Sequence, residues 1–230
     1  MSYNPDNQYR CTIIRGKSQT QMEDLLPLYA NMVHRLCPCT EDEFNERGNK
    51  FLSKALFGTD CYEILPDSNQ KTVRNHLTEI AGTLLALYRI DLDGYVYETE
   101  LCSYLLDTND FPAFFRNICL NFQFPNGTKK SNFVLQDVVN RINIKPFCFV
   151  VSLLYYAQQQ PHKHLLTKQE IGYYVLNSLE VLQGKVGVET VYHKIIEDRV
   201  NGVHKPQLSG SHDWQHIKEQ FNLLELANIV

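Results

Sequence analysis

The stretch from Thr72 to Tyr97, TVRNHLTEIAGTLLALYRIDLDGYVY, carries the two patterns that decide the fold. In its first part, up to Tyr88, apolar side chains recur at helical spacing, which predicts a helix. The later part alternates apolar and polar residues on both sides of Asp93-Gly94, and such a pair is the strongest short signal of a β-hairpin. We therefore expect a helix that leads directly into a two-stranded hairpin.

Two further helices are predicted upstream of this stretch. The first carries apolar residues at helical spacing from Leu25 to Leu36, and Pro27 either kinks it or delays its start. The second opens at the capping box Thr40-x-x-Glu43 and stops near Gly58. Three helices followed by a hairpin are typical of a winged helix, whose third helix places its N-terminal residues in the major groove of DNA.

The second half of the chain repeats the helical part of this pattern. A second capping box opens a helix at Thr167-x-x-Glu170, and two more helices are predicted over 188–199 and 212–228. The sequence stops where a wing strand would begin, so we expect a fragment of a longer protein or a shortened end. The expected fold class is mainly α with small β-hairpins, in which two winged-helix subdomains are joined by a helical linker subdomain. The expected boundaries are 1–105 for an N-terminal arm plus the first winged helix, 106–160 for the linker, and 161–230 for the second winged helix, truncated at its wing.

Composition indicates a soluble globular protein. The chain has 230 residues, of which 43% are hydrophobic and 21% charged, which argues against disorder. It contains no apolar run of the roughly 18 to 20 residues that a membrane span needs, and its first residues lack a secretory pattern. We therefore expect a cytoplasmic protein without a membrane partner, whose 7 cysteines are reduced and mostly buried.

The sequence lacks the common catalytic motifs. It has no phosphate-binding G-x-x-x-x-G-K-[ST] or G-x-G-x-x-G loop, no H-E-x-x-H and no G-x-S-x-G. No lysine is preceded two residues earlier by Asp or Glu, the spacing that the commonest metal-dependent nucleases use to act on a metal-bound water. His162 and His164 are interpreted as solvated loop residues rather than metal ligands. We therefore expect no catalytic residue, no metal and no nucleotide cofactor in this chain.

Short basic stretches mark candidate DNA contacts, because a protein of net charge −4 needs only a local positive patch to bind DNA. Base reading is expected from the N-terminal arm and from the start of the third helix, through Arg10, Arg15, Lys17, Arg74, Asn75, His76 and Glu79. The alternatives are a charged terminus that binds nothing and an ordinary solvated helix face. Glu79 either accepts a hydrogen bond from cytosine or simply keeps the helix soluble.

Phosphate contact is expected from a second set of polar residues, namely Lys71, Lys129, Lys130, Lys145, His212, Gln215 and Lys218. The three lysines from 129 to 145 are equally well explained as ordinary wet surface. The three residues from 212 to 218 lie on the last predicted helix, in the place that corresponds to the third helix of the first unit. A plain structural role is the alternative for them.

Several segments resemble the recognition domain of Type IIS restriction endonucleases of the BpuJI kind. They are YRCTIIRGK at 9–17, HLTEIAG at 76–82, FQFPNG at 122–127, the segment 170–179, QGK at 183–185 and QHI at 215–217. The loop sequence between Gly58 and Gln70 does not share this resemblance.

The resemblance implies two winged-helix subdomains separated by a linker, with base readers on the arm and on helices. It also implies double-stranded DNA as partner, a short asymmetric site containing G·C pairs, and a separate C-terminal nuclease domain that uses Mg²⁺. The chain alone would then be non-catalytic and its parent a Type II site-specific deoxyribonuclease. The alternative is a winged-helix protein-interaction or transcription-regulator scaffold, which the acidic balance favours.

Overall fold

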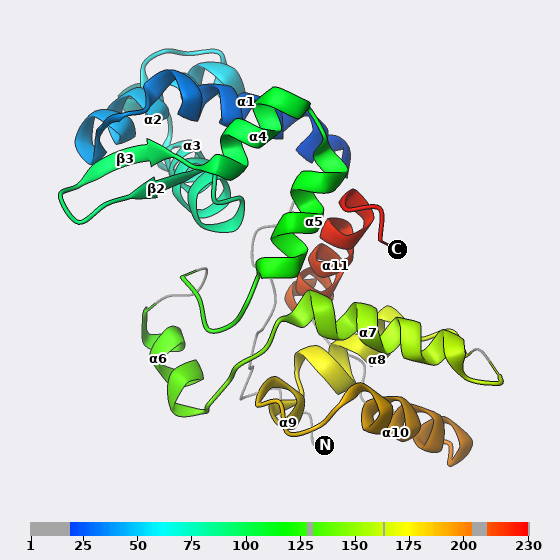
Figure 1. The fold of residues 1–230 in the computed structure, drawn as a ribbon. Coiled ribbons are helices and arrows are strands. Elements are labelled where there is room, and N and C mark those ends of the chain that lie inside the picture. The colour runs from blue at the N-terminus through cyan, green and yellow to red at the C-terminus, as the bar shows by residue number, and fades with distance from the viewer. Residues whose placement is uncertain (1–18, 128–130, 163, 204–210, 230) are drawn as a thin grey trace. The chain divides into compact units, whose positions relative to one another are not determined.

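The computed structural model describes residues 19–127, 131–162, 164–203 and 211–229, and the described part is mainly helical with a small antiparallel sheet (Figure 1). The chain divides into two compact units. We call residues 17–114 the N-terminal unit and residues 115–230 the C-terminal unit, and each is described by itself. The expected division at 105/106 and 160/161 remains a prediction.

The N-terminal unit contains the expected succession of three helices and a hairpin. Its elements are α1 (Gln19–Leu36), β1 (Cys39–Thr40), α2 (Glu41–Phe57), the 3₁₀ turn η1 (Tyr62–Ile64), α3 (Asp67–Arg74), the π-helix η2 (Asn75–Leu84), β2 (Tyr88–Ile90), β3 (Tyr95–Glu98) and α4 (Glu100–Thr108). The sheet has the order β1-β3-β2, so the hairpin gains a third, two-residue strand. Its core is formed by side chains from each of these helices and from β3, including Tyr29, Phe44, Leu52, Val73, Leu77 and Val96.

Local sequence signals account for the ends of these elements. Thr40 and Glu43 form the expected capping box at the start of α2, and Gly58 ends the helix with φ 73°, a left-handed conformation that glycine adopts without steric cost. The hairpin pairs Ile90 with Val96. Its turn is held by Asp91, whose carboxylate accepts hydrogen bonds from the backbone N–H groups of Asp93 and Tyr95 at 3.0 and 2.9 Å.

The third helix differs from the expected one in its start and in its geometry. It begins at Asp67, directly after Pro66, instead of at Thr72, so its N-terminal residues are not Arg74 and Asn75. The first turn carries no apolar residue, and hydrophobic periodicity therefore could not reveal it. From Asn75 onward the helix widens to π geometry. Arg74 and Asn75 thus lie at the junction of α3 and η2.

The C-terminal unit is helical. Its elements are α5 (Phe111–Asn121), which begins in the N-terminal unit, α6 (Ser131–Val139), α7 (Pro146–Gln159), α8 (Lys168–Ile171), the π-helix η3 (Gly172–Leu176), α9 (Leu179–Leu182), α10 (Val188–Val200) and α11 (Ser211–Leu226). Thr167 and Glu170 form the second expected capping box. In the part of the chain that the structure describes, no helix is long and apolar enough to cross a membrane.

The last helix is largely covered in its second half. Of the residues from Ile217 to Ala227 in and just after α11, all are buried except Lys218, which is exposed, and Glu225, which is half-buried. Even the polar side chains Glu219, Gln220 and Asn222 are covered. Over this part α11 is therefore a core helix and does not present the open face that the corresponding helix of the N-terminal unit presents.

Candidate nucleic-acid interface

The α3–η2 helix offers an open polar face to solvent. Lys71, Arg74, Thr78 and Glu79 are exposed on it, and Asn75 is half-buried. The spacing of three and four residues between Lys71, Arg74 and Thr78 places them along one side of the helix. Neither Lys71 nor Arg74 forms an ion pair within the described part of the chain. Two cations on this face are therefore available to an anionic partner.

A short turn borders this face on one side. Nη1 of Arg74 donates a hydrogen bond to the hydroxyl of Tyr62 in η1 at 2.7 Å. One turn earlier on the same side of the helix, the side-chain amide of Gln70 donates to the carbonyl oxygens of Glu63 and Leu65 at 3.3 and 2.9 Å. The loop that contains η1 is thus fastened to α3 at two levels.

His76 does not belong to this face, which corrects the expectation that it reads bases. Its side chain is 5% exposed, and Nδ1 forms a hydrogen bond with the hydroxyl of Tyr29 at 2.7 Å. The sequence did contain the signal. His76 stands three residues after Val73 and four before Ile80, so it lies on the apolar stripe of the helix.

The hairpin that follows the helix has a mixed surface. Arg89 lies over the ring of Tyr97, with the guanidinium carbon 4.8 Å from the ring centre, an arrangement that favours a cation–π interaction. At the tip of the turn the side chain of Leu92 is fully exposed, between Asp91 and Asp93. The strands of the hairpin therefore carry a cation, whereas its tip carries an apolar residue flanked by carboxylates.

The remaining candidate residues are spread over the chain. Arg10, Arg15, Lys17, Lys129 and Lys130 lie outside the described residues. His212 and Gln215 fall in α11, but their side chains are not among those described. Lys145, at the residue before α7, and Lys218 are both exposed. Tyr62, which no sequence pattern singled out, joins the interface through its contact with Arg74.

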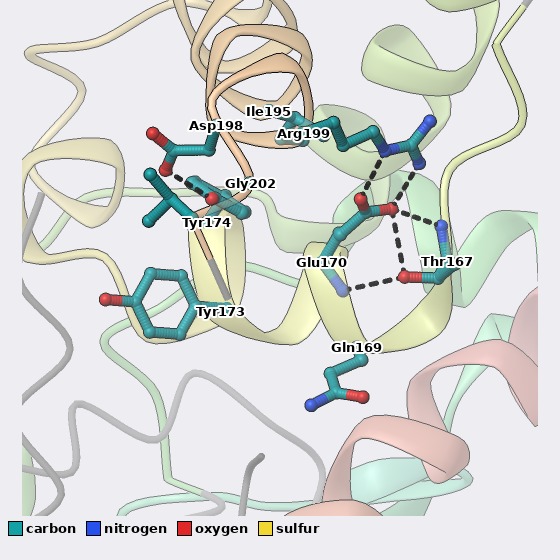
Figure 2. Close-up of a pocket in the computed structure, with 10 residues that line it drawn as sticks. Thr167, Gln169, Glu170, Tyr173, Tyr174, Ile195, Asp198, Arg199 and Gly202 are labelled. Carbon is teal, nitrogen blue, oxygen red and sulfur yellow. Dashed lines mark hydrogen bonds and ion pairs between the residues drawn. The ribbon is translucent and has the colours of Figure 1, made fainter. Parts of the chain in front are cut away.

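The C-terminal unit contains a cavity of about 580 Å³ between α8–η3 and α10 (Figure 2). On one side of it, the guanidinium of Arg199 donates to both carboxylate oxygens of Glu170 at 2.6 Å, and the backbone N–H of Thr167 donates to the same carboxylate at 2.7 Å. On another side, the hydroxyl of Tyr174 donates to the buried carboxylate of Asp198 at 2.6 Å. Each charged group that lines the cavity is therefore already bonded within the chain.

The pKa shifts in this cavity support a structural role for both the Glu170–Arg199 pair and the Tyr174–Asp198 pair. Burial alone would raise the pKa of Glu170, but the hydrogen bonds from Arg199 and Thr167 and the charge of Arg199 outweigh it and lower the pKa overall. Burial, followed by the hydrogen bond to Asp198, raises the pKa of Tyr174, so that its hydroxyl stays protonated and keeps donating. Across the described residues, no group of three or more His, Cys, Asp or Glu side chains could hold a metal ion.

Comparison with known proteins gives two matches that span the chain. The model of a family described as "Restriction endonuclease BpuJI - N terminal" matches residues 3–230. A solved structure described as pyrene- and phenanthrene-modified DNA in complex with the BpuJ1 endonuclease binding domain is 40% identical in sequence, with a TM-score of 0.83 over 99% of this chain and 79% of that one. None of the curated proteins compared with the chain matches it. Because the family model spans nearly every residue, the chain belongs to the family of N-terminal domains of the restriction endonuclease BpuJI.

Proposed function

We propose that this chain is a DNA-binding module of a restriction endonuclease and that it reads a short asymmetric duplex site. The observation that carries the proposal is the 40% identity, over 99% of the chain, to a binding domain whose structure was solved in complex with DNA. An open helix face with two unpaired cations, in the described part of the N-terminal unit, supports it independently.

The N-terminal unit acts in this proposal as a winged helix. Its element order, helix-strand-helix-helix followed by a hairpin, supports that assignment. The α3–η2 helix enters the major groove, where the amide of Asn75 suits adenine and the carboxylate of Glu79 suits the amino group of cytosine. The arm residues Arg10, Arg15 and Lys17 complete the base contacts.

The C-terminal unit has a supporting role. As a second winged helix it positions the module on the sugar-phosphate backbone through exposed cations such as Lys145 and Lys218, together with Lys129, Lys130, His212 and Gln215. Cleavage belongs to a C-terminal nuclease domain of the parent enzyme that uses Mg²⁺ and cuts at a distance, as Type IIS enzymes do.

Selection from a pool of random duplexes tests the proposal. The chain should enrich one short asymmetric sequence containing G·C pairs, and log Kd should rise with log salt by about 0.9 for each phosphate neutralised. Lys71→Ala should lower this slope by about one such increment, whereas Arg35→Ala, in the last turn of α1, should leave it unchanged. If no sequence is enriched at roughly 0.1 M salt, where specific complexes normally persist, the function is wrong.

One observation favours a second candidate, a protein-interaction module. The hairpin tip presents Leu92 between two carboxylates, a surface that suits a basic-rimmed apolar pocket better than a phosphate backbone. If this were the main role, Lys71→Ala and Arg74→Ala would leave duplex binding as weak as it was before substitution. A selected site whose binding depends on Lys71 would decide for DNA.

A further inference from the structure

The side of the helix on which Arg74 lies limits what it can reach. Arg74 and Gln70 are four residues apart, so both lie at the edge of the helix that faces η1, and both are hydrogen-bonded to that turn. Asn75 and Glu79 follow one residue and five residues later, so they lie further round the helix and away from η1. When a helix occupies a major groove, its middle faces the base edges and its flanks face the phosphates.

The hydroxyl of Tyr62 has one proton to donate and can accept hydrogen bonds on its oxygen. In the structure the oxygen accepts from Nη1 of Arg74 at 2.7 Å. A hydroxyl that accepts from a guanidinium cannot donate back to it, since arginine has no acceptor. Tyr62 is half-buried, and among the described residues no acceptor for its own proton is found. The O–H group is therefore available to an acceptor outside the chain, and the adjacent positive charge strengthens it as a donor.

We propose that Tyr62 and Arg74 form a phosphate clamp, in which the hydroxyl of Tyr62 and the guanidinium of Arg74 donate together to one backbone phosphate of the duplex. The clamp rests on the proposed function, since it needs DNA in the groove beside α3. It gives Arg74 a phosphate in place of the base contact expected from sequence. Tyr62 thereby becomes both a contact residue and the positioning residue for Arg74.

The two side chains of the clamp are already preorganised in the free protein. Gln70, one helical turn before Arg74, holds the η1 loop to α3, because its side-chain amide donates to two backbone carbonyls of the loop. Arg74 is free of ion pairs within the described residues, so no internal carboxylate competes with the phosphate for it. Because an arginine that is already oriented loses less side-chain entropy on binding, a contact of this kind contributes more affinity than a freely moving lysine would.

Binding measurements on the selected duplex, and on its single-base variants, test the clamp. Tyr62→Phe should weaken binding about tenfold, by the same factor for every sequence, and should leave the salt slope unchanged because no charge is lost. Arg74→Ala should weaken all sequences and lower the slope by about 0.9. In the Arg74→Ala background, Tyr62→Phe should cost no more than about twofold, since the two side chains act on one phosphate. Tyr104→Phe, an exposed tyrosine on α4, is the matched control and should bind like the wild type.

Three outcomes would overturn the assignment. Loss of discrimination at a single base pair in Tyr62→Phe or Arg74→Ala would make the residue a base reader. Wild-type affinity in Tyr62→Phe would show that its hydroxyl does not contact the DNA. If that substitution cost the same affinity with and without Arg74, the two side chains would not act on one phosphate. A wild-type chain that binds no duplex at all would instead overturn the DNA-binding function, and the clamp with it.

Discussion

Gly82 should not tolerate a methyl group, because the ring of Tyr88 lies against it. A Cβ atom built at Gly82 in η2 would stand 2.7 Å from the hydroxyl oxygen of Tyr88 and 2.8 Å from its Cζ. Ordinary contacts begin at 3.4 Å, so in Gly82→Ala the ring must retreat by about 0.7 Å. Since Tyr88 opens strand β2, the retreat would also move the hairpin away from the helix.

The ring has little room to retreat. Its other neighbour is the buried ring of Phe44, with the two ring centres 4.5 Å apart, and its hydroxyl donates to the carbonyl of Leu77 at 3.2 Å. Burial raises the pKa of Tyr88 to about 12, so that this donor stays protonated at neutral pH. Overpacking costs about 1–3 kcal/mol, and a ring with so little room should lie in the upper part of that range, at about 2–3 kcal/mol, of which the better helix propensity of alanine returns about 1 kcal/mol. We therefore expect a net loss of stability of about 1–2 kcal/mol.

Thermal unfolding followed by circular dichroism measures this loss. For a chain of this size 1 kcal/mol corresponds to about 2–4 °C, so the Tm of Gly82→Ala should fall by about 2–8 °C. Gly187→Ala is the control, because a Cβ there meets nothing within 4 Å; alanine is a poorer helix N-cap than glycine by about 0.5–1 kcal/mol, so this variant should lose no more than about 2–4 °C.

The double variant separates the contact from other effects of the substitution. Tyr88→Phe removes the atom nearest to the new methyl group, so the loss caused by Gly82→Ala should be smaller in that background than in the wild type. An unchanged or raised Tm in Gly82→Ala, or the same loss in both backgrounds, would refute the close approach of helix and hairpin.

Two further predictions concern pairs of polar side chains, one buried and one partly exposed. Tyr29→Phe takes the hydroxyl away from Nδ1 of buried His76 and should lower the free energy of unfolding by about 1–2 kcal/mol, measured in urea; a neutral result would contradict the hydrogen bond. Glu170→Gln should be less stable than the wild type by about 1–2 kcal/mol at neutral pH. Because the pKa of Glu170 is lower folded than unfolded, its contribution is present above the ordinary value of 4.5 and lost as the pH falls through the folded pKa, so the two proteins should converge in acid; a difference independent of pH would show that ionisation plays no part.

Sequence reasoning succeeded where a short motif carries its own geometry. The two capping boxes and the Asp93-Gly94 turn each fix a local hydrogen-bond pattern, and all three were found where they were expected. It failed where packing decides. His76 occupies a position on the apolar stripe of its helix, and a polar residue there is buried as soon as a partner such as Tyr29 satisfies it. Tyr62 belongs to a three-residue turn that no periodicity announces.

The same distinction applies to the last helix of the C-terminal unit, for which either phosphate contact or a plain structural role was expected. The order of the helices indicated α11, of which Lys218 is exposed, whereas nearly all the other side chains described on it are buried. The helix with an open face after the capping-box helix is α10, which exposes Glu189, His193 and Glu197. Of the two carboxylates on that face, Glu197 is paired with Lys194 at 2.9 Å and Glu189 would repel phosphates, whereas Lys71 and Arg74 on α3 attract them. If the chain binds DNA as proposed, the N-terminal unit should therefore supply more of the salt-dependent affinity than the face of α10, whatever sequence is read.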